Sequence, residues 1–178
     1  MQSVTDNPKN SKNLLITGGA GFIASNFIYY WKRNHPKDKI IVLDLLSYSA
    51  NINSIKSLIN KKTIEFIHGN INDQNLVSKI LKDFKITDLI NFAAETHVDR
   101  SIKNPSIFFE TNVIGTFNLL DCFKRNWEIN DKPKNWRFLH ISTDEVFGSL
   151  EFDEKPFCEV SPYKPRSPYS ASKASSDH

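Results

Sequence analysis

The sequence predicts a doubly wound α/β fold built on a parallel sheet. Apolar runs of strand length alternate with helical segments, and most of the runs end in polar residues. The first run, 14–16, leads into the turn Gly18-Gly19-Ala20-Gly21, after which a helix can start. Strands that alternate with helices favour a parallel sheet with helices on both faces. In such sheets ligands bind beyond the carboxyl ends of the strands.

Five strands and four intervening helices are expected in this order along the chain. The strands are expected at 14–16, 39–44, 63–68, 88–92 and 137–142, and the helices at 21–34, 51–60, 74–84 and 106–126. The first helix should stop before Pro36, and Asp73 should cap the third. The helix 106–126 is apolar on more than one stripe, so we expect it to pack on more than the sheet, for example on a partner subunit. The residues 127–135 are expected to form a polar surface loop.

The glycine-rich turn is expected to bind the pyrophosphate of a dinucleotide. Gly18 allows a tight turn, and the glycines at 19 and 21 leave backbone N–H groups open to a phosphate at a helix N-terminus. Asp44 ends the second strand about 20 residues further on, where a Rossmann fold places its ribose-binding carboxylate. A carboxylate there repels a 2′-phosphate, and no basic residue follows in 45–48, so NAD is favoured over NADP. Alone, each feature is also common in purely structural roles.

Two groups of residues near the end of the chain carry the expected chemistry. Tyr169 and Lys173 lie four residues apart, so on a helix they share one face. An ammonium near the phenol would favour the phenolate, which can take a proton from a hydroxyl group whose carbon loses hydride. After the fifth strand, Ser142 or Thr143 supplies a hydroxyl, and Asp144-Glu145 supplies the two carboxyl groups that elimination of water requires. The alternatives are an ordinary surface helix and an acidic loop.

Composition excludes several other classes of protein. The 178 residues, 39% of them hydrophobic, suffice for one core, and the net charge of +3 is too small and dispersed to indicate nucleic acid. Cys122 and Cys158 are isolated and lack metal-ligand spacing, so both are expected as reduced thiols and no metal site is expected. Residues 1–12 are expected to be a flexible tail without a signal peptide, and no segment approaches a membrane span. A cytoplasmic location is therefore expected.

Five motifs closely resemble those of the nucleotide-sugar 4,6-dehydratases, which are extended short-chain dehydrogenase/reductases. In chain order the motifs are 17–23, 93–101, 111–116, 142–148 and 167–175. The resemblance covers nearly the whole chain from residue 13 and is greatest to members that act on dTDP-glucose. Three residues depart from the usual pattern, since Asn70 stands for Asp, Thr96 for Ser and Phe147 for Tyr.

The resemblance implies an NAD site made of residues from the turn and from the ends of later strands. Asn70 and Ile71 would lie near the adenine, and 92–96 would lie along the nicotinamide side. The full implied set is Gly18, Gly21, Phe22, Ile23, Asp44, Leu45, Leu46, Ser47, Asn70, Ile71, Phe92, Ala93, Ala94, Glu95, Thr96, Thr111, Tyr169 and Lys173.

The resemblance also implies a catalytic set of Thr143, Asp144, Glu145, Tyr169 and Lys173. Tyr169 would deprotonate the sugar 4-hydroxyl, which hydrogen-bonds Thr143, as hydride leaves C4 for NAD. Glu145 would then remove the C5 proton while Asp144 protonates the departing C6 hydroxyl. Return of hydride to C6 gives a 4-keto-6-deoxy sugar. Thr96, with Thr143, would contact this substrate.

Length and nucleotide choice leave alternatives open. Family members are about twice as long, so residues 13–178 are expected to be an incomplete NAD-binding domain that lacks the substrate domain and is inactive alone. The full-length protein is expected to be a homodimer. The sequence does not separate dTDP from UDP, because those contacts should come from the second half. A nucleotide-sugar 4-epimerase or decarboxylase, and a non-catalytic NAD-binding module, are the other readings.

Overall fold

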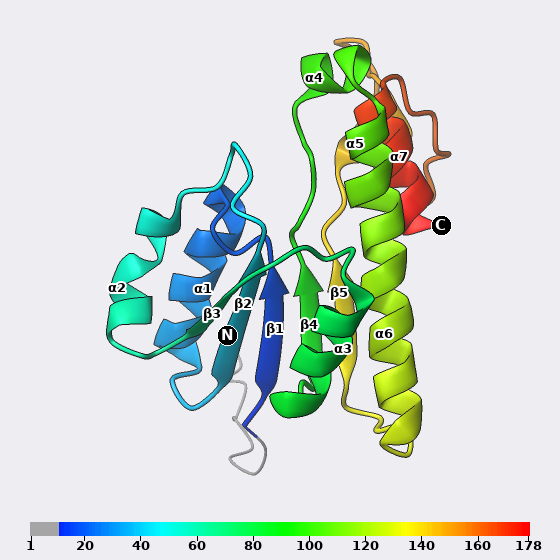
Figure 1. Cartoon of the computed structure of the whole chain (residues 1–178). Helices are drawn as coiled ribbons and strands as arrows, with labels where there is room; N and C mark the ends of the chain where they lie inside the picture. The colour runs from blue at the N-terminus through cyan, green and yellow to red at the C-terminus, as the bar shows by residue number, and fades with distance from the viewer. Residues whose placement is uncertain (1–10) are drawn as a thin grey trace, which may run out of the picture.

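A five-stranded parallel sheet runs through the middle of the computed structural model, which describes residues 11–178 (Figure 1). Its strands are β1 (Asn13–Thr17), β2 (Lys39–Asp44), β3 (Glu65–His68), β4 (Asp88–Asn91) and β5 (Arg137–His140). The spatial order is β3-β2-β1-β4-β5 with every pair parallel. The predicted doubly wound fold is confirmed. Residues 1–10 of the expected flexible tail lie outside the described residues.

The strand order places the ligand-binding edge of the sheet. The chain builds outward from β1 to β3 and then crosses to β4 on the other side of β1. At such a reversal the connections leave the strand ends in opposite directions, which opens a crevice at the carboxyl edge. All five strands end at that edge, and the arrows of β1 and β4 point upward in Figure 1 toward α4 and α5.

Helices cover both faces of the sheet, as a doubly wound fold requires. On one face lie α1 (Phe22–Asn34), η1 (Ile52–Ser54) and α2 (Lys56–Asn60), and on the other lie α3 (Gln74–Asp83) and α6 (Gly115–Ile129). Successive strand residues point to opposite faces. Accordingly Leu14 and Ile16 pack with the α1 side, whereas Leu15 packs with the α3 and α6 side.

Local sequence signals explain where α1 ends and where α3 begins. The helix α1 stops at Asn34, two residues before Pro36, as predicted. Asp73 caps α3, because its Oδ1 accepts a hydrogen bond from the backbone N–H of Leu76 at 3.0 Å. Both signals act between residues a few positions apart, so they can be read from the local sequence.

The expected helix over 106–126 differs from the observed one. It consists of α5 (Ser106–Phe108), the π-helical η2 (Phe109–Ile114) and α6, which continues to Ile129. The loop expected from residue 127 therefore starts later. Apolar side chains on η2 and α6 remain exposed, among them Ile114, Phe117 and Leu120. The short helix α4 (Val98–Lys103) was not anticipated, because its six mostly polar residues show no helical period.

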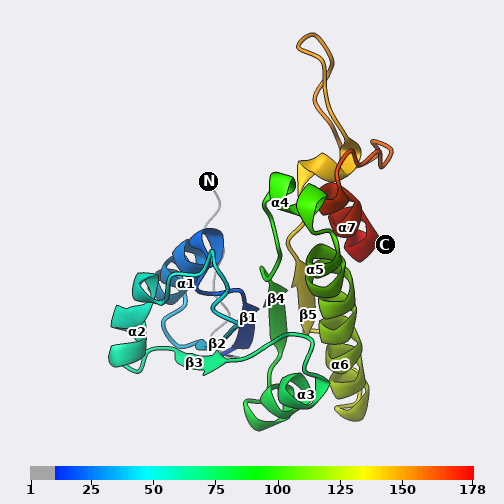
Figure 2. The same ribbon diagram turned by 45° about the horizontal axis from the view of Figure 1, so that its top comes forward.

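The last part of the chain returns to the carboxyl edge of the sheet. After β5 come the 3-10 turn η3 (Asp144–Phe147) and the helix α7 (Pro168–Asp177), and the segment between them projects away from the sheet (Figure 2). Ser167 and Ser170 form a capping box at the start of α7. Within residues 11–178, no helix combines the length and the apolar character needed to cross a membrane.

Substitution of Leu15 by alanine tests the account of the core. Leu15 is fully buried in the central strand, so Leu15→Ala should lower the free energy of unfolding by about 2 to 5 kcal/mol. Leu150, which is exposed between η3 and α7, provides the control, and Leu150→Ala should change it by less than about 0.5 kcal/mol. Chemical denaturation measures both. Equal effects would show that β1 is not the centre of the core.

Candidate active site

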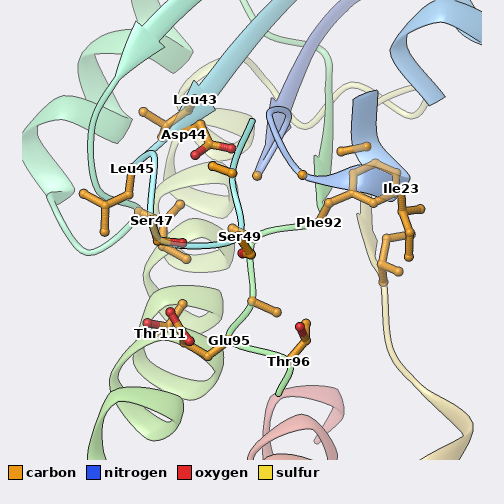
Figure 3. Close-up of a pocket in the computed structure, with 18 of the residues that line it drawn as sticks. Ile23, Leu43, Asp44, Leu45, Ser47, Ser49, Phe92, Glu95, Thr96 and Thr111 are labelled. Atoms are coloured by element: carbon orange, nitrogen blue, oxygen red, sulfur yellow. The ribbon is translucent and has the colours of Figure 1, made fainter. Parts of the chain in front are cut away.

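A pocket opens at the carboxyl edge of the sheet, where the ends of β1, β2 and β4 meet the start of α1 (Figure 3). All the residues expected to hold a cofactor line this pocket, except Leu46. The expectation came from separate motifs, and the fold brings these motifs together. The pocket is also lined by residues that the sequence did not single out as binding residues, which are Ala24, Leu43, Ser49, Ala50, Gly69, Ile141 and Ser142.

The glycine-rich turn forms one wall of the pocket. Gly18 has a φ of +66°, and a Cβ there would lie 2.8 Å from the backbone N and Cα of Ala93, so only glycine fits. A Cβ on Gly19 would lie 2.4 Å from Cγ1 of Val42, so this glycine lets the turn lie on β2 and does not line the pocket. In the part of the chain that the structure describes, no side chain caps the N-terminus of α1. Its first N–H groups therefore remain available to an anion.

Asp44 connects the turn to the loop that follows β2. Its Oδ2 accepts a hydrogen bond from the Ala20 N–H at 2.9 Å, and its Oδ1 accepts one from the Leu46 N–H at 2.7 Å. Each carboxylate oxygen keeps a further lone pair for a ligand hydroxyl. Leu46 thus orients Asp44 through its backbone N–H and is not among the residues that line the pocket.

Glu95 is an orphaned carboxylate on the pocket wall. The side chain is only 6% exposed, and its Oε2 has no hydrogen-bond partner among the residues that the structure describes. Burial raises the pKa of Glu95, while the charge of Arg100 lowers it. The guanidinium of Arg100 lies over the ring of Tyr48, 3.5 Å from the ring centroid. An unpaired buried oxygen is costly, so a ligand that donates a hydrogen bond to it would be favoured.

Tyr169 and Lys173 both line the pocket from α7, one helical turn apart, as their spacing predicted. Burial lowers the pKa of Lys173 to about 8. Burial also raises the pKa of Tyr169, hydrogen bonding with Thr143 lowers it, and the charges of Glu145 and Asp144 raise it. The expected activation of the phenol by Lys173 is therefore not the dominant effect in the protein alone.

The turn η3, which Thr143 caps and which holds Asp144 and Glu145, packs against α7, the helix of Tyr169. The charges of Glu145 and Asp144 raise the pKa of Tyr169. The Thr143 hydroxyl caps η3 by accepting a hydrogen bond from the Glu145 N–H at 3.3 Å. This cap places a hydroxyl, an exposed carboxylate and a half-buried carboxylate next to one phenol. Such a set can donate and accept several protons on a single bound molecule.

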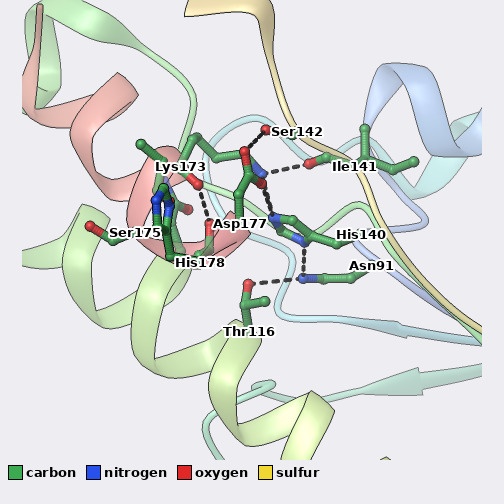
Figure 4. Close-up of polar contacts among 12 residues, drawn as sticks. Asn91, Thr116, His140, Ile141, Ser142, Lys173, Ser175, Asp177 and His178 are labelled. Carbon is green, nitrogen blue, oxygen red and sulfur yellow. Dashed lines mark hydrogen bonds and ion pairs between the residues drawn. The ribbon is translucent and has the colours of Figure 1, made fainter. Parts of the chain in front are cut away.

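Sequence reasoning missed the polar residues behind Lys173. Asn91, Thr116, His140 and Asp177 form a network that reaches the Lys173 amine (Figure 4). Asn91 and His140 end β4 and β5 and are paired in register, so their side chains meet. The sequence did hold one signal for this network, because Asn91 is a polar residue at the end of the otherwise apolar run of β4.

The fold and the pocket define the class of this protein. The sheet is of the Rossmann type, with a glycine turn after its first strand and a carboxylate after its second. A Tyr-x-x-x-Lys pair lies in the same pocket. These features define a short-chain dehydrogenase/reductase of the extended type. A family model described as GDP-mannose 4,6 dehydratase matches residues 15–178, and the chain belongs to this family.

Individual relatives are similar over most of the chain. A dTDP-glucose 4,6-dehydratase of Haemophilus influenzae is 44% identical over 168 residues, which cover 93% of this chain and 49% of the relative. The crystal structure of dTDP-glucose 4,6-dehydratase from Bacillus anthracis in complex with NAD has a TM-score of 0.80 and 40% identity, covering 94% of this chain and 48% of that one. A UDP-Glc/GlcNAc 4-epimerase from Campylobacter jejuni has a TM-score of 0.80 at 28% identity, covering 94% and 47%. The chain thus spans about half the length of these relatives.

Replacement of Glu95 by glutamine tests whether the carboxylate is uncompensated. Because the pKa of Glu95 is raised in the folded state, its charge destabilises the fold above the ordinary pKa of a glutamate. Glu95→Gln should therefore raise the free energy of unfolding at pH 7 by about 1 kcal/mol, or Tm by about 2 to 4 °C. The gain should disappear below about pH 4.5, where the wild-type carboxyl is protonated.

Thermal unfolding in ligand-free buffer at pH 4 and pH 7 measures the effect of Glu95→Gln. The control Glu159→Gln removes a carboxylate from an exposed position and should leave Tm unchanged at both pH values. A loss of stability at pH 7 would show that Glu95 is compensated in the fold.

Proposed function

We propose that this chain carries the NAD site and the catalytic residues of a dTDP-glucose 4,6-dehydratase. The observation that carries the proposal is the meeting of Asp144 and Glu145 with Tyr169 beside a dinucleotide-type pocket. The names of the relatives, reported above, support the choice of sugar nucleotide.

The residues of the pocket fit NAD. Gly18 leaves room where a Cβ would meet the backbone, and Asp44 keeps lone pairs for ribose hydroxyls. Glu95 presents a buried oxygen to which no group of residues 11–178 donates. The pocket is lined from the glycine turn as far as Tyr169 and Lys173, so one dinucleotide would reach both. When bound, NAD supplies a hydride acceptor for the oxidation at C4 and a hydride donor for the reduction at C6.

The first step for the protein side chains is removal of the proton from the sugar 4-hydroxyl. Tyr169 removes it while the Thr143 hydroxyl holds the oxygen in place, and Lys173 lies one helical turn away in the same pocket. A raised pKa in the protein alone makes the phenol a poor base at pH 7. A positive charge brought close to the phenol would favour its phenolate form.

The acidic pair performs the elimination of water. Oxidation at C4 acidifies the C5 proton, which Glu145 removes from its half-buried position. Asp144, which is exposed, gives a proton to the departing C6 hydroxyl. One carboxyl group acts as the base and its neighbour acts as the acid. Glu145 returns the proton to C5 as C6 is reduced, and the proton that Tyr169 took from the 4-hydroxyl replaces, through water, the one that Asp144 gave up, so all three groups regain their starting protonation.

The alternatives share the pocket, and two of them do not use the acidic pair. A 4-epimerase needs the oxidation and its reversal, without proton transfers at C5 and C6, and the epimerase of Campylobacter jejuni shows that the fold is common to both activities. A UDP-glucose 4,6-dehydratase would use the same residues with another nucleotide. A non-catalytic NAD-binding module would have no use for Asp144 and Glu145.

Two further properties belong to the proposal. The exposed apolar side chains of Ile114, Phe117 and Leu120 along η2 and α6 support a homodimer that buries this helix. A cytoplasmic location is also proposed, as part of the same function.

The test of the proposed reaction is product analysis with the full-length gene product, NAD and dTDP-glucose. We expect a 4-keto-6-deoxy product whose mass is lower by one water. An epimerase would give dTDP-galactose with unchanged mass, and a binding module would give no product. UDP-glucose in a parallel reaction identifies the nucleotide. The 178-residue chain alone should bind NAD without turnover, because its relatives are about twice as long.

Substitutions in the acidic pair should separate oxidation from dehydration. Asp144→Asn and Glu145→Gln should lower product formation by about 10²- to 10⁴-fold, because each removes one proton transfer. Reduction of bound NAD in a single turnover should persist in both variants, whereas Tyr169→Phe should abolish it.

Glu151 carries an exposed carboxylate in the segment before α7. Its variant Glu151→Gln is the matched control for the acidic pair and should keep full activity. If product formation is unchanged in Asp144→Asn and Glu145→Gln, the acidic pair has no catalytic role and the assignment of dehydration to it fails.

A further inference from the structure

A row of polar side chains lies at the carboxyl ends of three neighbouring strands, and Figure 4 labels two of them, Asn91 and His140. Thr17, Asn91 and His140 are the last residues of β1, β4 and β5, and the strand registers pair Thr17 with Asn91 and Asn91 with His140. Thr17 and Asn91 are fully buried. Their hydrogen bonds must therefore be made within the protein.

The direction of the Asn91 amide follows from its neighbours. The Thr17 Oγ1 accepts a hydrogen bond from the Ala93 N–H at 3.3 Å, so its own proton is free to be donated to Asn91 Oδ1 at 2.6 Å. The amide nitrogen of Asn91 then points away from Thr17. It donates to Thr116 Oγ1 at 3.0 Å and to His140 Nδ1 at 3.2 Å. The opposite orientation would leave the buried Thr17 hydroxyl proton without an acceptor.

The donor on Asn91 determines the tautomer of His140. Because Nδ1 accepts a hydrogen bond, the neutral ring carries its proton on Nε2. Burial and the charge of Lys173 lower the pKa of His140 to about 4, although Asp177 raises it, so the ring is neutral at pH 7. The Nε2–H then lies 3.3 Å from Lys173 Nζ and 3.6 Å from Asp177 Oδ1.

Lys173 is held between this N–H group and a backbone carbonyl. It is 3% exposed, and its amine donates to the Ile141 carbonyl at 2.6 Å. An ammonium offers only donors, so a charged Lys173 gains no hydrogen bond from the His140 Nε2–H, which can turn to Asp177. A neutral amine has a lone pair that accepts the same N–H. The carboxylate of Asp177 is held nearby by Ser142 Oγ at 2.6 Å and Tyr163 OH at 3.1 Å.

We propose that His140 is a positioning residue that keeps the Lys173 amine in place in both of its protonation states, by offering one fixed Nε2–H to Asp177 or to Lys173. The proposal rests on the proposed function, in which Lys173 acts beside Tyr169. The other titratable groups near Lys173 are Asp177 and Tyr169 on α7 and Glu95 after β4, with Asp144 and Glu145 facing Tyr169 from η3.

Two variants of His140 separate this role from simple packing. His140→Asn keeps an oxygen near the position of Nδ1 for Asn91 and removes the N–H beside Lys173. His140→Gln reaches further and places an amide N–H near the position of Nε2. The Lys173 amine should therefore titrate alike in the wild type and in His140→Gln, and differently in His140→Asn.

The main readout is the titration of Lys173 followed by NMR of lysine labelled with ¹³C at Cε, in the full-length gene product without sugar. The wild type should titrate near pH 8, the value that burial produces. In His140→Asn, water replaces the N–H group and stabilises the ammonium, so the midpoint should rise by about one unit or more. His140→Gln should titrate near the wild-type value. His35→Asn, in which the changed side chain lies beside Trp31 after α1, should have no effect.

The same shift should appear in activity. The alkaline limb of the kcat profile should move to higher pH in His140→Asn and stay in place in His140→Gln. The ¹⁵N shifts of His140 should show a neutral ring protonated at Nε2 at pH 7.

Two results would overturn the inference. One is an unchanged Lys173 midpoint in His140→Asn. The other is a His140 ring that is charged or protonated at Nδ1 at pH 7. Because the titrations need no substrate, they can succeed even if dTDP-glucose is not dehydrated, and in that case the proposed function fails while the role of His140 stands.

Discussion

The buried amide of Asn91 is the interaction on which the functional edge of the sheet depends. Its oxygen accepts from β1 through Thr17, and its nitrogen donates to α6 through Thr116 and to β5 through His140. Each partner is itself polar, so the loss of the amide would leave several buried groups unpaired at about 1 to 3 kcal/mol each. The ends of three strands, from which the pocket walls start, are therefore held at fixed positions relative to one another.

The buried amide of Asn112, on η2, acts in the same way. The side chain of Asn112 accepts from the Glu95 N–H at 2.8 Å and donates to the Glu95 carbonyl at 3.0 Å and to Ser172 Oγ at 2.9 Å. It joins the segment after β4 to the π-helical η2 and to α7. Because neutral amides hold this frame, neither Glu95 nor Lys173 forms an ion pair with any group in residues 11–178. They remain available to a ligand, at a cost in stability that burial imposes on both.

The parts that sequence reasoning predicted well depend on short-range signals. Alternating apolar runs located all five strands, Asp73 marked the start of α3, and the spacing of Tyr169 and Lys173 placed both in one pocket. The hydrogen bond from the Leu46 N–H to Asp44 was not predicted, because no side-chain pattern reveals a backbone donor. The helix α4 was missed because its residues are held by the surrounding fold and lack a period of their own.

The sequence by itself determined the order of elements, the glycine turn and the list of chemical groups, because these follow from residue types and from spacings of a few positions. Only the tertiary structure decided which of these groups meet and in which protonation state. The registers of β1, β4 and β5 bring Thr17, Asn91 and His140 into one row. Burial there lowers the pKa of Lys173 and raises that of Tyr169. Register and burial are properties of the assembled sheet, since they depend on strands far apart along the chain.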